Sequence, residues 1–140
     1  MSLLSTKSNK LFSGFAKEHI SIFKKLNTPA KIQDFLETLK ANFGNSHLSP
    51  KKVLEKREAH CFEGALFAAA ALRFHGWPPL LVDLKVADGD DDHVIAVFKE
   101  NKHWGAIGKT NHAVLRYRDP VYKNDRELVM SFFIEYFLEN

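Results

Sequence analysis

The order of the predicted elements along the chain indicates an α+β protein. Amphipathic helical patterns fill the first part, up to an Ala-rich helix that ends at Gly76. Short segments rich in apolar and β-branched residues follow, and one amphipathic helix closes the chain. Because helices and strands are segregated along the chain, we expect N-terminal helices and the Ala-rich central helix packed on an antiparallel sheet, with a C-terminal helix.

The length and composition indicate one ordinary globular domain. A chain of 140 residues can bury its own core, so residues 1–140 are interpreted as a single domain. Residues 1–10 are rich in Ser and Lys and are expected to be frayed. The net charge of +3 is small, and the basic residues are spread along the chain, which argues against a nucleic-acid partner.

The sequence also bears on the compartment. A single cysteine cannot form an internal disulfide, and residues 1–25 lack the apolar core of a secretory signal. No apolar run approaches the roughly 20 residues that a membrane-spanning helix needs. We therefore expect a cytoplasmic protein that does not associate with a membrane.

Two helices are expected before the central one. Apolar residues recur at helical spacing over residues 11–26, with lysines between them. Thr28 is suited to an N-cap and Pro29 to the first turn of a second helix, which should end before Gly44. Residues 45–56 are expected to form a loop that ends in one short turn.

The central helix is expected to begin near Cys61. Alanines dominate its interior. Gly76 is suited to a left-handed C-terminal cap, and the prolines that follow Trp77 cannot continue the helix. Small side chains allow a helix to lie close to a sheet. We expect Ala65, Ala69 and Leu72 to be buried against the strands.

Alternating and β-branched patterns predict the strands, and turn residues separate them. The last helix is expected over residues 126–138, capped by Asn124 or Asp125. The expected strands are 80–86, 93–98, 104–107 and 113–118, with an acidic turn at 88–92 and a short hairpin connection at 100–102.

Cys61 is the strongest candidate for a catalytic residue. A thiol in the first turn of a helix faces unpaired backbone N–H groups and the positive end of the helix dipole, which both favour the thiolate. A lone cysteine is more often a small buried hydrophobic residue. The polar neighbours His60 and Glu63 favour a partly accessible thiol, and we therefore interpret Cys61 as a nucleophile.

His93 is the expected base. It begins the strand after the acidic turn, and that strand can lie across the start of the central helix. A third group should accept the other N–H of the ring. If residues 100–102 form a hairpin tip, Asn111 lies on the same side as His93, one diagonal step away. Asp119 is the alternative if the last strand pairs elsewhere.

These features resemble the transglutaminase-like branch of the papain-like cysteine protease fold. The resemblance rests on Cys61 opening an Ala-rich helix, His93 opening a strand, a following Trp104 and a later Asp119-Pro120. It covers roughly residues 57–120.

The resemblance implies catalysis by Cys, His and an Asp or Asn, with Cys61 and His93 in the first two roles. It also implies a protein, a peptide or a small amide as the substrate, with Trp104 and His60 as expected substrate contacts. Members of the family commonly carry the acid after the tryptophan, where this chain has Gly108-Lys109. The third position is therefore open between Asn111 and Asp119.

Three further patterns depart from the binding motifs that they resemble, so no cofactor and no metal are expected. The run from Gly105 to Thr110 is similar to the end of a phosphate-binding loop, but His103 occupies the place of its first glycine. The acidic turn 88–92 lacks the ligand spacing of a calcium loop. One cysteine leaves three zinc ligands to be supplied by scattered residues.

Two functions fit these residues. The first is a cysteine-nucleophile acyl-transfer enzyme, either an amide hydrolase or peptidase or a transglutaminase-type acyltransferase, which forms a thioester on Cys61 with His93 as base. Backbone N–H groups at the helix start would stabilise the oxyanion. The alternative is a catalytically silent binding module that uses the cleft between the central helix and the sheet.

Overall fold

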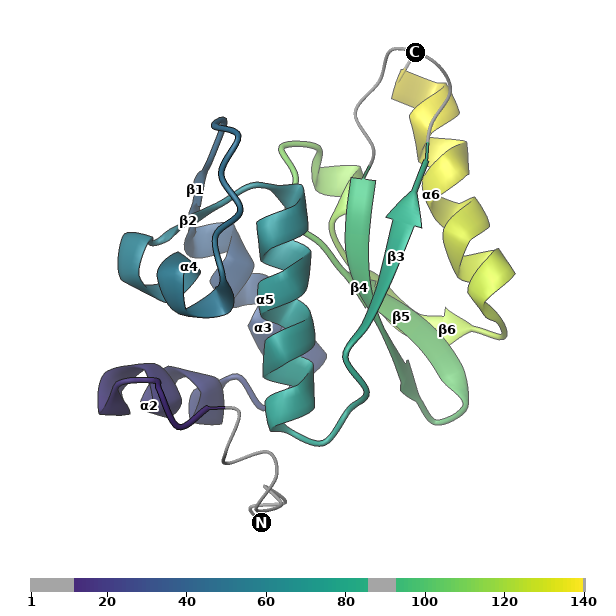
Figure 1. The fold of residues 1–140 in the computed structure, drawn as a ribbon. Coiled ribbons are helices and arrows are strands. Elements are labelled where there is room, and N and C mark those ends of the chain that lie inside the picture. Colours follow the sequence, from purple (N-terminus) through teal and green to yellow (C-terminus); the bar gives the residue numbers. More distant parts are fainter. Residues whose placement is uncertain (1–11, 86–92, 140) are drawn as a thin grey trace.

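A computed structural model describes residues 12–85 and 93–139. The protein is mixed α+β, which confirms the predicted class (Figure 1). The expected frayed segment 1–10 and the acidic turn 88–92 lie outside the described residues. In chain order the elements are α2 (Lys17–Lys25), α3 (Pro29–Thr38), β1 (Lys40–Ala41), α4 (Pro50–Lys56), β2 (Glu58–Ala59), α5 (Cys61–Phe74), β3 (Leu80–Leu84), β4 (His93–Glu100), β5 (His103–Ile107), the 3₁₀ helix η1 (Ala113–Leu115), β6 (Arg118–Tyr122) and α6 (Asp125–Glu139).

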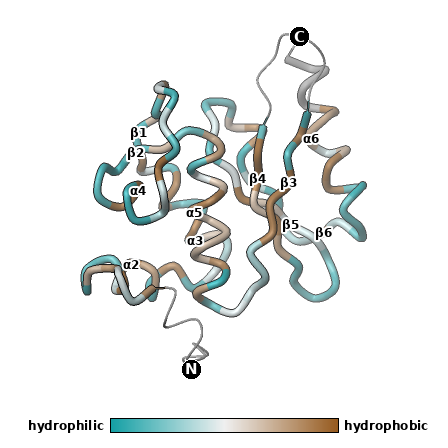
Figure 2. Tube along the Cα trace, viewed as in Figure 1, coloured by the Kyte–Doolittle hydropathy of each residue, from teal (hydrophilic) through white to brown (hydrophobic). Residues whose placement is uncertain are grey.

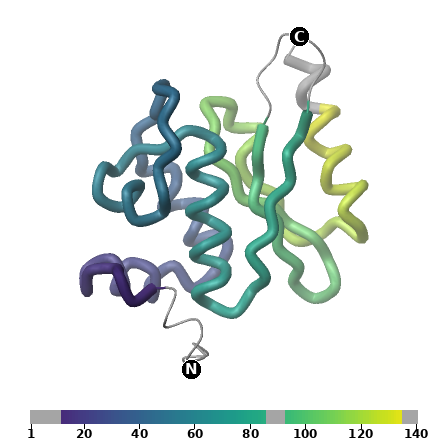
Figure 3. Tube along the Cα trace, viewed as in Figure 1, coloured from purple at the N-terminus to yellow at the C-terminus, as the bar shows by residue number. Residues whose placement is uncertain are grey.

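The four strands β3, β4, β5 and β6 form an antiparallel meander in that order. Helix α5 covers one face of this sheet, and α6 covers the other (Figure 1). Colouring by sequence shows that the N-terminal helices gather on the α5 side, whereas the C-terminal helix lies on the other side (Figure 3). The sheet therefore lies between two helical layers.

Alternate side chains of β4 enter two different cores. Ala96 and Phe98 belong to the cluster that contains the interior of α5, whereas Ile95 and Val97 pack with Leu128 and other residues of α6. Figure 2 shows hydrophobic residues along both α5 and β4. This alternation is the period of two that a strand imposes on its side chains. The predicted burial of Ala65, Ala69 and Leu72 on α5 is confirmed.

Helix starts agree with the capping residues in the sequence. Thr28 Oγ1 accepts a hydrogen bond from the Lys31 backbone N–H at 3.2 Å, which confirms the predicted cap of α3. Asn124 Oδ1 accepts one from Glu127 N–H at 2.9 Å, at the start of α6. Helix α4, which we expected only as a turn, is likewise capped by Ser49.

The segment after α3 differs from the prediction. The helix ends at Thr38, and Leu39 is extended. Lys40 and Ala41 then form β1, which pairs in parallel with β2. This two-residue ladder between distant segments leaves no periodic signal in the sequence, so the helix was expected to continue toward Gly44. The first helix is also shorter than expected and begins at Lys17.

The end of the sheet differs as well. Residues 113–115 form the 3₁₀ helix, and the last strand is Arg118–Tyr122. Pro120 is tolerated there because β6 pairs with β5 alone among the described strands. Asn101 and Lys102 both have positive φ, as a two-residue hairpin turn requires.

That turn shifts the hairpin register by one residue. Ala96 pairs with Ile107 rather than with the expected Ala106. In the described part of the chain, no helix combines the length and the apolar character needed to cross a membrane.

Candidate functional site

The start of α5, where Cys61 is the first residue, is fixed by a capping box. The N-cap is His60, whose Nδ1 accepts a hydrogen bond from the Glu63 backbone N–H at 3.3 Å. The Glu63 carboxylate accepts one from the His60 backbone N–H at 3.0 Å. Cys61 itself is half-buried, which agrees with the expectation of a partly accessible thiol.

His60 is held by hydrogen bonds within the protein. Its Nε2 lies 2.7 Å from the backbone oxygen of Ser46. A carbonyl oxygen only accepts hydrogen bonds, so Nε2 carries the proton, and Nδ1 is left to accept the capping bond. We expected His60 to contact the substrate, but both of its ring nitrogens are engaged in holding the helix start.

Glu63 is fully buried beneath the first turn of α5, at 0% exposure. Besides the His60 N–H, its carboxylate accepts hydrogen bonds from Asn42 Nδ2 at 2.9 Å, from Ser46 Oγ at 3.0 Å and from the Leu48 backbone N–H. Burial raises the pKa of this carboxyl, but these hydrogen bonds outweigh burial, and the net pKa lies below its ordinary value. The charged carboxylate thus ties the loop 42–48 to the start of α5.

The sequence contained a signal for this role. Spacing of three residues between an N-cap and a glutamate is that of a capping box. We noted Glu63 only as a polar neighbour of Cys61, because histidine is an unusual residue at the N-cap.

The end of β5 is clamped against the helical layer. The side chain of Gln33, which is buried on α3, donates from Nε2 to the Gly108 oxygen at 2.9 Å and accepts from the Gly108 N–H at 3.0 Å. Lys109 packs on Gly64 of α5 so closely that a Cβ at Gly64 would overlap Lys109 Cβ. The clamped segment, Gly108-Lys109, is therefore fixed between α3 and α5.

Lys109 is an unusual lysine in this setting. Its Nζ donates a hydrogen bond to the backbone oxygen of Leu39 at 2.7 Å. Burial lowers the pKa of Lys109, and the charge of Arg116 lowers it further, whereas Glu37 acts in the opposite direction. Sequence reasoning assigned Lys109 no role, because its importance depends on contacts between distant elements.

His93 is buried at the start of β4, and one ring nitrogen is held by the main chain. Its Nε2 lies 2.9 Å from the backbone oxygen of Leu115, so Nε2 carries the proton. Burial lowers the pKa of His93, the hydrogen bond to Leu115 opposes this effect, and the positive charge of Arg118 and His112 lowers it further. The ring is therefore neutral at neutral pH, with Nδ1 unprotonated.

Cys61 and His93 belong to the same end of the molecule. The start of α5 and the start of β4 lie at one end of the helix and sheet layers (Figure 1). The clamped segment connects the two elements, because Lys109 packs on Gly64 of α5 and a Cβ at Gly108 would lie 3.5 Å from His93 Cε1. The starts of the two elements therefore lie at the same end of the fold, and hydrogen-bond reach between Cys61 and His93 stays a prediction.

The orientation of His93 was not predicted. His93 lies two residues before Ile95 on β4, so the two side chains point to the same face of the sheet, and Ile95 packs with α6. The ring centroid of His93 lies 6.1 Å from that of Phe132 on α6. The side chain thus belongs to the sheet face opposite the one that α5 covers. The reason is the strand alternation, which assigns Ala96 and Phe98 to the α5 face.

The expected third residues do not hold the protonated nitrogen of His93. Asn111 is exposed in the loop after β5, which ends at Ile107, so the diagonal strand position expected for Asn111 does not exist. Asp119 is exposed on the edge strand β6. The partner of Nε2 is the Leu115 carbonyl, and a main-chain acceptor cannot be found from side-chain patterns.

Trp104, which we expected to contact the substrate, lies near the opposite end of β5 from the clamped segment. It pairs with Lys99 and Tyr122 in the sheet and packs against the α6-side core. Lys99 Nζ lies 5.5 Å from the centre of the tryptophan ring system. These contacts indicate a structural role for Trp104.

Metal ligands do not gather at this site. Among the residues that the structure describes, no three His, Cys, Asp or Glu side chains are arranged to hold a metal ion. A comparison with known protein families matched none of them, and a search of curated proteins found no significant match.

Proposed function

We propose that this protein is a cysteine-nucleophile acyl-transfer enzyme of transglutaminase-like architecture, with Cys61 as nucleophile and His93 as base. The observation that carries the proposal is the state of His93. The Leu115 carbonyl fixes its proton on Nε2, which leaves Nδ1 as a free base at the end of the molecule where Cys61 begins α5. The packing of the Cys-bearing helix on an antiparallel sheet supports the finer fold assignment.

In the proposed reaction, Cys61 Sγ attacks the carbonyl carbon of an amide while its proton passes to His93 Nδ1. The C–N bond then breaks, and the leaving amine takes the proton from the imidazolium, which leaves a thioester on Cys61. Water, or a second amine, attacks the thioester after losing a proton to the imidazole. The acyl product leaves, and the returning proton restores the thiol.

The surroundings of His93 favour a neutral imidazole at rest. The lowered pKa of His93 disfavours the imidazolium, so proton transfer accompanies the attack rather than preceding it. Backbone N–H groups in the first turn of α5 can stabilise the oxyanion. The proposed substrates are proteins, peptides or small amides.

One observation favours a second candidate, a catalytically silent binding module of the same architecture. The ring of His93 packs toward α6, and the partner of its Nε2 is a carbonyl rather than a carboxylate. A carbonyl carries no charge to stabilise the imidazolium. Such a module would use the cleft between α5 and the sheet without chemistry.

Acylation of Cys61 by p-nitrophenyl acetate, followed by intact mass spectrometry, separates the two candidates. For the enzyme, we expect a transient acetyl adduct on Cys61, formed faster than on free cysteine at pH 7. His93→Ala should slow its formation by about 100-fold. His103→Ala, which changes a histidine at the far end of β5, is the matched control and should acylate normally.

Two results would contradict the enzyme. One is an acylation rate equal to that of free cysteine, and the other is an equal rate in the His93→Ala and His103→Ala proteins. Either result would favour the silent module.

A further inference from the structure

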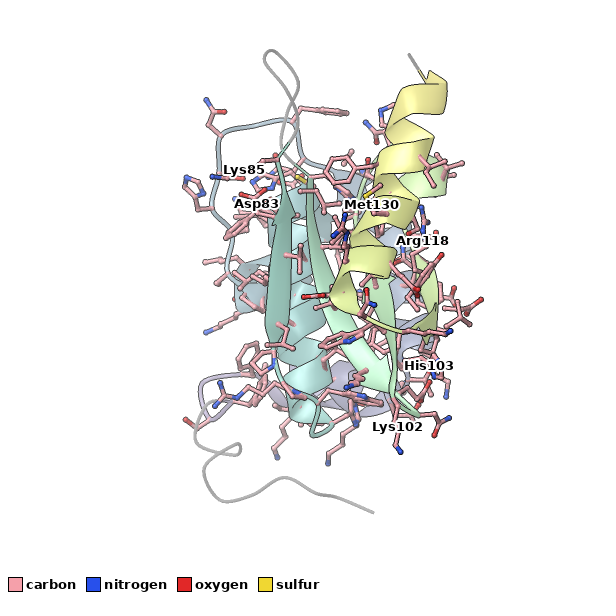
Figure 4. All side chains as sticks on the ribbon, turned by 90° about the vertical axis from the view of Figure 1, so that its right-hand side faces the viewer. Asp83, Lys85, Lys102, His103, Arg118 and Met130 are labelled. Carbon is pink, nitrogen blue, oxygen red and sulfur yellow. The ribbon has the colours of Figure 1, made fainter. Side chains whose placement is uncertain are left out.

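Strand β3 leaves one edge of the sheet open. Among the described strands, β3 pairs with β4 alone. Leu80 and Leu81 are 41% and 39% exposed, and Asp83 and Lys85 are exposed as well. In Figure 4, β3 is the outermost strand of the sheet, with Asp83 and Lys85 beside it.

The opposite edge of the sheet is protected, whereas β3 is not. Strand β6 contains Pro120, which has no N–H to offer, and Arg118 Nε donates to Ser131 Oγ on α6 at 3.0 Å. A proline at an edge removes an N–H that an added strand would need. Strand β3 has no proline, and Leu80 and Leu81 expose apolar side chains along it.

We infer that an extended segment of a substrate polypeptide adds to β3 as an antiparallel fifth strand. This inference rests on the proposed function and names its substrate class. Leu84, the last residue of β3, pairs with His93. An antiparallel strand added along β3 therefore begins at the end of the sheet where the proposed site lies, and its main chain supplies the affinity.

A second copy of this chain fits the edge less well. A strand of five residues spans about 17 Å. Pairing of two such edges buries little beyond the strands themselves, whereas stable interfaces bury about 1,200–2,000 Å². A short edge is suited to a transient occupant such as a substrate segment.

The charges beside β3 specify the pattern of the added segment. Side chains two residues apart share a face, so Leu81, Asp83 and Lys85 lie in one row. In an antiparallel pair, the facing residues of the partner should be acidic opposite Lys85, then basic opposite Asp83, then apolar opposite Leu81. From its N-terminus, the segment preferred by β3 therefore has an acidic residue, then a basic one two positions later, and then an apolar one two positions after that.

The test is an NMR titration of the full chain carrying Cys61→Ser, which separates binding from chemistry. The probe is the capped peptide Glu-Thr-Lys-Val-Leu-Thr, and the control peptide of equal composition exchanges its Glu and Lys. We expect amide shifts in residues 80–85 and about tenfold weaker binding of the exchanged peptide, since its charges repel Lys85 and Asp83.

Reversal of both protein charges sharpens the test. Asp83→Lys with Lys85→Asp should invert the preference, so that the exchanged peptide binds about tenfold more tightly. Glu100→Lys, a charge reversal at the far end of β4, should leave the preference unchanged. Equal affinity for the two peptides, no shifts in residues 80–85, or a preference that survives the double reversal would overturn the inference.

The outcomes also separate the inference from the proposed function. If β3 binds the two peptides with different affinities but Cys61 of the wild type is not acylated, the proposed enzyme is rejected and β3 remains a binding surface. Acylation without peptide discrimination would keep the enzyme and reject the edge. A dimer in sedimentation that dissociates on Leu81→Lys would assign the edge to a second copy and overturn the inference.

Discussion

A buried charge organises the candidate site at the scale of single residues. Glu63 accepts hydrogen bonds from two side chains and two backbone N–H groups, and these donors come from the loop 42–48 and from His60. Because the helix that carries Cys61 begins at these contacts, the position of the thiol depends on the carboxylate of Glu63.

Replacement of Glu63 by glutamine tests this dependence. Every partner of the carboxylate is a donor, so the amide NH₂ of Glu63→Gln would face donors and leave at least one of them unsatisfied. We expect the free energy of unfolding to fall by roughly 1–3 kcal/mol in urea denaturation at pH 7. Glu55→Gln removes an exposed carboxylate paired with Lys52 at 3.2 Å and should change stability little. Equal stability of the two variants would show that the network contributes nothing.

The third position of the proposed triad gives a second residue-level prediction. The Leu115 carbonyl already holds the Nε2 proton of His93, and Asn111 and Asp119 are both exposed. We therefore expect Asn111→Ala and Asp119→Asn each to alkylate at Cys61 with iodoacetamide as fast as the wild type. A severalfold slower rate in one variant would identify that residue as the orienting group.

The sequence predicted the roles of single residues where the hydrogen-bond partners lie close together along the chain. The N-caps Thr28 and Asn124 were expected and are observed. The Gln33 contacts to Gly108 were not expected, because 75 residues separate the two partners. The Leu115 carbonyl was missed for a different reason, since any residue type offers the same acceptor.

At the scale of elements, the contact between α5 and the end of β5 depends on a glycine. Gly64 lies inside α5, where alanine would ordinarily stabilise a helix by about 1 kcal/mol. Here Lys109 occupies the space that a Cβ would need, and Gln33 holds the adjoining Gly108 in place. The two effects oppose each other, and the rigidity of the clamped segment decides which is larger.

We expect Gly64→Ala to lower the free energy of unfolding by about 1–3 kcal/mol, because the clash exceeds the gain in helix propensity. Thermal and urea denaturation would measure the change. Gly14→Ala is the matched control, because nothing lies within 4 Å of a Cβ at Gly14. A more stable Gly64→Ala protein would mean that Lys109 moves away freely.

The bounds of helices and strands were predicted best where the spacing of apolar residues was regular. Helix α5 and strand β4 were expected near their observed bounds, whereas β6 was expected five residues too early because Ala113–Leu115 has the apolar character of a strand. The hairpin register was wrong by one residue, since it depends on a turn at Asn101 and Lys102 that the sequence only suggests.

At the scale of the whole molecule, the sequence predicted the α5 layer and the helix that covers a sheet face. It did not predict which side of the sheet each β4 residue would meet. His93 and Ile95 share one core with α6, while Ala96 shares the other with α5. Both layers therefore contain a buried titratable group, Glu63 beneath α5 and His93 beneath α6, and the stability of the whole fold should respond to pH through both.

The sign of that response is the same for the two groups. The pKa of Glu63 is lowered by folding, so its contribution is complete above the unfolded pKa near 4.5 and is lost as the pH falls through the folded value. The pKa of His93 is also lowered, so below about pH 6.5 the unfolded chain binds a proton that the folded protein does not. Each group therefore destabilises the fold as the pH falls, and the two windows begin at different pH values.

We expect the free energy of unfolding to decline from pH 6.5 downward, with a contribution from His93 of at most about 1.4 kcal/mol per pH unit, and to decline again below pH 4.5. Urea denaturation from about pH 3 to about pH 8 would measure both windows. His93→Gln should flatten the upper window and keep the lower one, whereas His103→Gln, at the far end of β5, should keep both. If His93→Gln declines as steeply as the wild type between pH 6.5 and 5, then another group controls the upper window, and the buried neutral imidazole on which the proposed base depends would lose its support.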